Sequence, residues 1–135
     1  CVDGETRVRL LLDTCTFLWI VGGMSDLSPR ARELFVDPDN EVYLSAVSAW
    51  EIALKYAAGR LPLPESPERF VPAERRRHGI DTLGLDEETT LHLGRLPPLH
   101  RDPFDRMLVC QAIVHGLVVL GPDSLITQYP IRTAW

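Results

Sequence analysis

Apolar residues along the chain gather in short runs that alternate with longer amphipathic stretches. The runs at residues 8–12, 42–44 and 117–120 are almost wholly apolar, which is typical of strands buried on both faces of a parallel sheet. Residues 80–85 and 131–134 add two weaker strand patterns. The pattern predicts a mostly parallel sheet built from short strands.

Helical spacing of apolar residues fills the intervals between these strands. Capping residues and glycines mark the ends of the predicted helices, and the proline-rich residues 95–103 predict a loop. The predicted helices cover residues 17–21, 28–35, 45–58 or 48–58, 68–78, 86–94 and 104–115. Strands that alternate with helices in this way predict an α/β domain, with a mostly parallel central sheet flanked by helices.

Length and composition indicate one domain, which we assign to residues 8–135, with residues 1–7 as an N-terminal extension or a lead-in to the first strand. The 135 residues are 45% hydrophobic and 24% charged, enough for a core that needs no disulfide or metal. Cys1, Cys15 and Cys110 are far apart, which argues against a disulfide framework or a zinc site. No apolar stretch approaches the roughly 20 residues of a membrane span, and no signal-peptide pattern is present, so we expect a cytoplasmic protein with no membrane partner.

The net charge of −5 argues against broad, nonspecific attraction to nucleic acid, because such binding usually depends on a basic face. It does not exclude a nuclease, since a bound metal ion reverses the sign of an acidic site. Of the 14 basic residues only Lys55 is a lysine, and arginine is the side chain that grips phosphate with two parallel hydrogen bonds.

Acidic residues fall where the predicted strands end and the next helices begin. Asp13 follows the first strand, Glu51 lies early in the helix after the second, Asp102 and Asp105 open the helix after the proline-rich loop, and Asp123 follows the strand at 117–120. The carboxyl ends of parallel strands share one edge of a sheet, so these side chains can converge. Two carboxylates about 4 Å apart repel by about 4 kcal/mol at an effective dielectric constant near 20.

That repulsion is a large fraction of a domain's stability of about 5 to 15 kcal/mol, so the cluster needs a compensating charge. Magnesium or manganese ions prefer carboxylate and water oxygens and are commonly held together with a substrate phosphate. Metal-assisted hydrolysis of a phosphodiester is therefore the reaction that the cluster favours.

Each acidic residue also has a purely structural interpretation. Glu51 stands four positions before Lys55, which is typical of an exposed helical ion pair, and the pair Ser48 and Glu51 fits a capping box. Asp102 can cap a helix, and Asp123 can serve as a turn residue. Asp13, a charge at the end of an apolar strand, is the hardest of these to explain by structure alone.

Three segments resemble the PIN domains, particularly the VapC-like toxins of type II toxin-antitoxin systems. They are Leu-Leu-Asp-Thr at 11–14, Leu-Ser-Ala-Val-Ser-Ala-Trp-Glu-Ile at 44–52 and His-Arg-Asp-Pro-Phe-Asp-Arg-Met-Leu at 100–108. The closing segment from Asp123 to Pro130 is also similar, so the resemblance covers nearly all of residues 8–135. It implies a PIN-like fold and an endoribonuclease dependent on Mg²⁺ or Mn²⁺, with tRNA, rRNA or mRNA as the substrate.

The resemblance also assigns expected roles and partners. Asp13, Glu51, Asp105 and Asp123 match the family's catalytic, metal-binding acidic positions, and Asp102 is an additional candidate ligand. The resemblance implies that Thr14 and Ser48 donate hydrogen bonds to the ligands, and we choose Arg101 and Arg106 for phosphate contacts, although solvated surface charge is an equal alternative. A VapB-like antitoxin and a second copy of the chain, forming a homodimer, are the expected protein partners.

Two positions depart from the family pattern. Gly121 stands where relatives often have a hydroxyl residue, and Cys15 stands where they often have histidine. An aspartyl phosphatase would need a second aspartate at position 15, and a receiver domain would need paired early acids and a late lysine, so both of these classes are excluded. The remaining alternative is a non-catalytic PIN-like binding module whose acidic groove binds a basic partner peptide.

Overall fold

The computed structural model describes residues 7–135 and contains a five-stranded, wholly parallel sheet. The strand order is β3-β2-β1-β4-β5. The expected N-terminal extension lies, except for its last residue, outside the described part of the chain. The strands are β1 (Arg9–Leu12), β2 (Glu41–Ser45), β3 (Asp81–Leu83), β4 (Val118–Leu120) and β5 (Thr133–Ala134).

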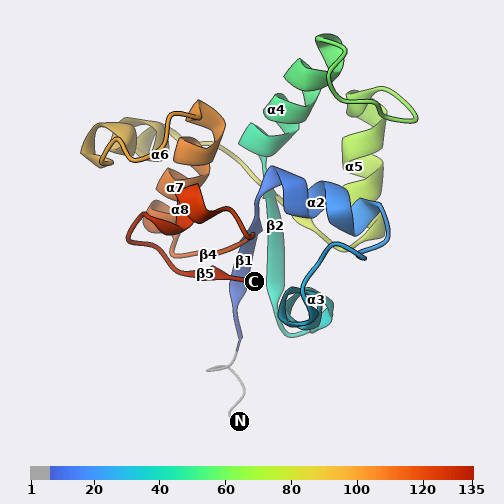
Figure 1. The fold of residues 1–135 in the computed structure, drawn as a ribbon, viewed down its shortest axis with the longest axis horizontal. Helices are drawn as coiled ribbons and strands as arrows, with labels where there is room; N and C mark the ends of the chain where they lie inside the picture. The colour runs from blue at the N-terminus through green and yellow to red at the C-terminus, as the bar shows by residue number, and fades with distance from the viewer. Residues whose placement is uncertain (1–6) are drawn as a thin grey trace.

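Helices cover both faces of this sheet, so the domain has three layers. Figure 1 shows α2, α3 and α5 on one side of the sheet and α6, α7 and α8 on the other, while α4 rises from the end of β2. The helices are α2 (Thr14–Val21), α3 (Pro29–Val36), α4 (Ala46–Ala57), α5 (Pro67–Arg77), α6 (Glu87–Leu91), α7 (Pro103–His115) and α8 (Ser124–Thr127), with a 3-10 turn η1 (His92–Arg95).

The central strand β1 is buried on both faces, which explains its continuous run of leucines. Leu10 and Leu12 pack into one apolar cluster with residues of α2, α4 and α5. Leu11 points to the opposite face and packs with residues of α7 and β4. Because side chains alternate along a strand, three consecutive leucines contribute to two separate cores.

The predicted elements are confirmed in kind, and their bounds differ at the ends. The strand predicted at 80–85 is shorter, at Asp81–Leu83, and the four-residue helix α8 has too few residues to show helical spacing. Helix α4 begins at Ala46, and the Ser45 hydroxyl accepts a hydrogen bond from the backbone of Val47. Ser48 therefore lies inside the helix, and the capping-box interpretation of Ser48 and Glu51 is wrong.

None of the helices within residues 7–135 is both long and apolar enough to cross a membrane.

Candidate functional site

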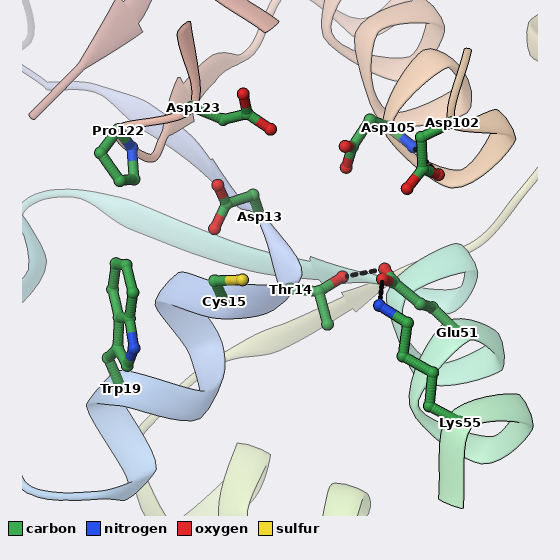
Figure 2. A pocket seen from close by; sticks show the side chains of 10 residues that line it. All are labelled: Asp13, Thr14, Cys15, Trp19, Glu51, Lys55, Asp102, Asp105, Pro122 and Asp123. Carbon is green, nitrogen blue, oxygen red and sulfur yellow. Dashed lines mark hydrogen bonds and ion pairs between the residues drawn. The ribbon is translucent and has the colours of Figure 1, made fainter. Parts of the chain in front are cut away.

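A cavity of about 340 Å³ opens at the carboxyl ends of β1, β2 and β4. Figure 2 shows the acidic side chains of Asp13, Glu51, Asp102, Asp105 and Asp123 around this cavity, contributed by four separate segments of the chain. Its walls are completed by Thr14, Cys15, Trp19, Lys55 and Pro122. All five acidic residues singled out by the sequence therefore line one pocket.

Three of these carboxylates are also helix caps. Asp13 Oδ1 accepts a hydrogen bond from the backbone N–H of Thr16 at 2.7 Å, at the start of α2. Asp102 Oδ1 accepts from Phe104 and Asp105 at the start of α7, and Asp123 Oδ1 accepts from Leu125 at the start of α8. Capping fixes the backbone of each residue and places the carboxylate beside backbone N–H groups, which favour negative charge.

Glu51 is held in place by its neighbours on both oxygens. The Thr14 hydroxyl lies 2.6 Å from Oε1 of Glu51 and 2.9 Å from Oγ of Ser48. That hydroxyl has a single proton, which it donates to the carboxylate, the stronger acceptor, so it accepts from Ser48. Lys55 Nζ lies 2.5 Å from Oε2. The Thr14 hydroxyl therefore contacts Glu51 as expected, whereas Ser48 is connected to Glu51 only through Thr14.

The exposed-pair interpretation of Glu51 and Lys55 is wrong for Glu51. The two residues do form an ion pair one helical turn apart, but Glu51 is only 5% exposed. Hydrogen bonding to Glu51 raises the pKa of Lys55, which keeps the ammonium charged beside the carboxylate. The pair belongs to the wall of the pocket and not to the solvated face of α4.

Burial raises the pKa values of two carboxyl groups in the pocket, those of Asp13 and Asp105. Burial raises the pKa of Asp13, although the hydrogen bonds from Thr16 oppose this effect. Burial, followed by repulsion from Asp102, raises the pKa of Asp105 to about 6. Repulsion from Asp123 adds to both shifts. Carboxyl groups whose pKa values are raised by burial and by neighbouring carboxylates are typical of functional sites, where a cation can stabilise their charged form.

The residues present fit a hard divalent cation. Carboxylate oxygens from several segments face one cavity, and burial together with repulsion between these carboxylates raises the pKa of Asp13 and of Asp105. His100 Nε2 and one oxygen each of Asp105 and Asp123 lie within 4.8 Å of one another, so the two carboxylates are close enough to share an ion. Oxygen ligands in this number favour magnesium, calcium or manganese.

The two arginines that the sequence suggested for phosphate contacts, Arg101 and Arg106, do not line the pocket. Arg101 is exposed at the surface and Arg106 is half-buried. The Nε of Arg106 is buried and has no hydrogen-bond partner among the described residues, while one of its terminal nitrogens lies 3.5 Å from the backbone oxygen of Leu96. Phosphate binding by these two arginines stays a prediction.

Several other residues of the site carry no role predicted from the sequence. His100 contacts Asp105, with His100 Nε2 lying 2.9 Å from Asp105 Oδ2, and Trp19 and Pro122 form part of the wall. In the sequence, the only indication of a role for His100 is its place two residues before Asp102, in the segment at 100–108 that resembles PIN domains. Cys15 lines the pocket, and burial raises the pKa of its thiol, which disfavours the thiolate that a cysteine nucleophile would need.

Comparison with known proteins gives the family. The sequence matches the PIN domain family over residues 10–129. The chain belongs to the PIN domain family. This PIN domain shares 41% identity over 68 residues with the ribonuclease VapC16 of Mycobacterium tuberculosis. That match covers 50% of this chain and 48% of the relative, so only about half of the curated relative's length is matched.

Solved structures share the fold of this PIN domain at low identity. VapBC2 from Rickettsia felis, bound to a DNA fragment from its promoter, superposes with a TM-score of 0.72 at 13% identity over 94% of this chain and 98% of the other. DNA-bound VapBC from Salmonella typhimurium gives a TM-score of 0.65 at 21% identity over 94% and 97%. At these identities the comparison establishes the three-layer architecture of the PIN domain.

Proposed function

We propose that this PIN domain is a metal-dependent endoribonuclease that hydrolyses RNA phosphodiester bonds, and that it is the toxin of a VapBC-type toxin-antitoxin pair. One observation carries the proposal: five carboxylates from four segments line one cavity, and the pKa values of Asp13 and Asp105 are raised there. The 41% identity with a ribonuclease supports RNA as the substrate, whether tRNA, rRNA or mRNA.

In this proposal Asp13, Glu51, Asp105 and Asp123 hold Mg²⁺ or Mn²⁺, with Asp102 as an additional ligand. Such an ion supplies an acidified water and neutralises phosphate charge. Asp13 and Asp123 keep one oxygen on a helix cap, so each presents its other oxygen to the cavity in a fixed orientation. The hydrogen bond from Thr14, supported by Ser48, orders the side chain of Glu51 on folding, so less conformational entropy is lost when a metal binds.

Lys55 has a separate role in the proposed site. Its ammonium group compensates Glu51 before a metal is bound, and the side chain is 40% exposed toward solvent. With a cation in the pocket to compensate Glu51, Lys55 would be free to contact an RNA phosphate. Arg101, at the exposed start of the same acidic loop, is the second proposed phosphate contact, and Arg106 is the third.

The partners are proposed from the relatives. The similar solved structures are of proteins named VapBC, which supports a VapB-like antitoxin as the cognate partner of this chain. A homodimer is proposed from the family resemblance. A basic segment of an antitoxin would complement an acidic pocket of this kind, and its insertion would exclude RNA.

The catalytic proposal is tested with total RNA and the purified chain. Incubations contain Mg²⁺, Mn²⁺ or EDTA, and the 5′ and 3′ ends of new fragments are sequenced. Asp13→Asn keeps the shape of the side chain and removes its charge, so it should abolish new ends. Glu33→Gln, an exposed residue of α3 on the far side of the domain, is the matched control and should cut like the wild type.

The same experiment separates the nuclease from a non-catalytic binding module. Cleavage that requires a divalent ion and disappears in Asp13→Asn supports the nuclease. RNA profiles that are identical in every lane, together with a melting temperature indifferent to Mn²⁺, would overturn it and favour a module whose groove binds a basic peptide.

A further inference from the structure

His100 lies at the edge of the acidic pocket and has no role in the proposed function. It precedes α7 in the loop after η1, and its side chain is only 10% exposed. Its Nε2 lies 2.9 Å from Oδ2 of Asp105 and 4.0 Å from Oδ2 of Asp123. A nearly buried imidazole therefore contacts one proposed metal ligand and approaches a second one, which comes from a different segment of the chain.

The position of His100 is fixed by two further hydrogen bonds. Its backbone N–H donates to the hydroxyl of Tyr129 at 2.9 Å, and Tyr129 is only 2% exposed. The backbone N–H of Asp102 donates to Nδ1 of the imidazole over 3.4 Å. Tyr129 anchors the loop to the core, and the contact with Asp102 orients the ring.

These contacts also assign the proton of the ring. Because Nδ1 accepts from Asp102, the neutral imidazole carries its proton on Nε2. Nε2 then donates to the carboxylate of Asp105. A ring nitrogen that carries a proton has no lone pair available for a metal ion. In this arrangement His100 Nε2 is therefore a hydrogen-bond donor to Asp105 and not an additional metal ligand.

We propose that His100 is a positioning residue that holds Asp105 in the orientation from which it can share an ion with Asp123. The inference rests on the proposed metal-dependent function. Residues that donate hydrogen bonds to metal ligands fix their orientation, and losing one typically lowers metal affinity by about 10- to 100-fold. Asp105 needs such a support because its carboxylate, unlike those of Asp13, Asp102 and Asp123, caps no helix.

A pair of substitutions isolates the donated hydrogen bond. His100→Gln places an amide nitrogen near the position of Nε2 and keeps the donor, whereas His100→Asn is too short to reach Asp105. The dissociation constant for Mn²⁺ is measured from the electron paramagnetic resonance signal of the free ion, and the melting temperature of each metal-free chain is measured alongside. We expect His100→Asn to bind Mn²⁺ at least about tenfold more weakly, and His100→Gln to bind it like the wild type.

The outcomes are distinguishable from failure of the proposed function. If the wild type binds Mn²⁺ and all three chains share one dissociation constant, the positioning role is overturned and the metal site stands. Equal losses in His100→Gln and His100→Asn would also overturn it, because the shape of the ring and not its donor would then matter. If the wild type binds no Mn²⁺, the proposed function and this inference fail together. If His100→Asn does not fold, His100→Leu, which also lacks a donor, replaces it in the same comparison with His100→Gln: weaker Mn²⁺ binding in the leucine variant alone supports the inference, and equal binding in the two variants overturns it.

Discussion

Gly121 lies in close contact with the carboxylate of Asp13. A Cβ atom built on Gly121 would stand 2.7 Å from Cγ of Asp13, which is too close for any side chain. The backbone of Gly121 cannot move away easily, because its N–H donates to the backbone oxygen of Ala134 at 3.2 Å. Asp13 is equally fixed by the hydrogen bond from Thr16. The space that a side chain at position 121 would need is therefore occupied by the carboxylate of Asp13.

Gly121→Ala should weaken Mn²⁺ binding, because the new methyl group forces Asp13 to turn and to lose its hydrogen bond to Thr16. Loss of a helix cap costs about 1 kcal/mol, so the metal-free chain should also be less stable by about that amount. Calorimetric titration with Mn²⁺ and urea unfolding measure the two effects. Gly94→Ala is the matched control, since nothing lies within 4 Å of a Cβ built there. Equal Mn²⁺ affinity in the wild type and Gly121→Ala would contradict this account.

Thr14→Val should lower both stability and RNA cleavage. Valine has the shape of threonine but leaves Ser48, which is fully buried, and Glu51 without their shared partner. A buried polar group left unpaired costs about 1 to 3 kcal/mol. Urea unfolding measures this loss, and fragment yield from total RNA measures the effect on activity. Thr14→Ser retains the hydroxyl and should recover most of both; a serine variant as impaired as the valine variant would show that packing of the methyl group matters instead.

Lys55→Met should destabilise the protein more in EDTA than in Mn²⁺. Without metal, methionine leaves the buried carboxylate of Glu51 with only the Thr14 hydroxyl, whereas an ion in the pocket would supply the missing charge. Lys55 is partly exposed, so we expect a loss of no more than about 1 kcal/mol. Melting temperatures in the two buffers measure it. The same difference from the wild type in both buffers would argue that Lys55 and the ion do not substitute for each other.

The raised pKa of Asp105 predicts how the metal-free protein responds to pH. The ordinary value is 3.8 and burial raises it to about 6, so between these values the folded chain binds more protons than the unfolded one. The stability that this proton contributes is fully present below the ordinary pKa and is lost as the pH rises through about 6. The melting temperature of the metal-free wild type should therefore fall relative to that of Asp105→Asn across this window. Two parallel curves would contradict the raised pKa.

Much of this site is predictable because strand ends are visible in a sequence. The apolar run before Asp13 and the run before Asp123 place both residues at the same edge of a parallel sheet, and the structure confirms this. The sequence leaves the environment of Glu51 open, because its four-residue spacing to Lys55 is the same for an exposed and for a buried ion pair. Only the packing of α4 against α2 and α7 decides that Glu51 faces the pocket.

Other features leave little trace in a single sequence. His100 stands in a loop without periodicity, and its contact with Asp105 depends on the anchor at Tyr129, which is distant along the chain. The close approach of Gly121 to Asp13 joins two neighbouring strands, so it depends on their pairing, which brings Leu12 beside Leu120. Contacts of this kind follow from tertiary structure and not from local pattern.

The carboxylates of the pocket come from positions as far apart as 13 and 123, and the strand that carries the last of them pairs with the strand that carries the first. During synthesis, a growing chain therefore has no assembled site until the segment around β4 has left the ribosome and joined β1. If the pocket cuts RNA, a chain truncated before β4 would lack Asp123 and would have no complete site.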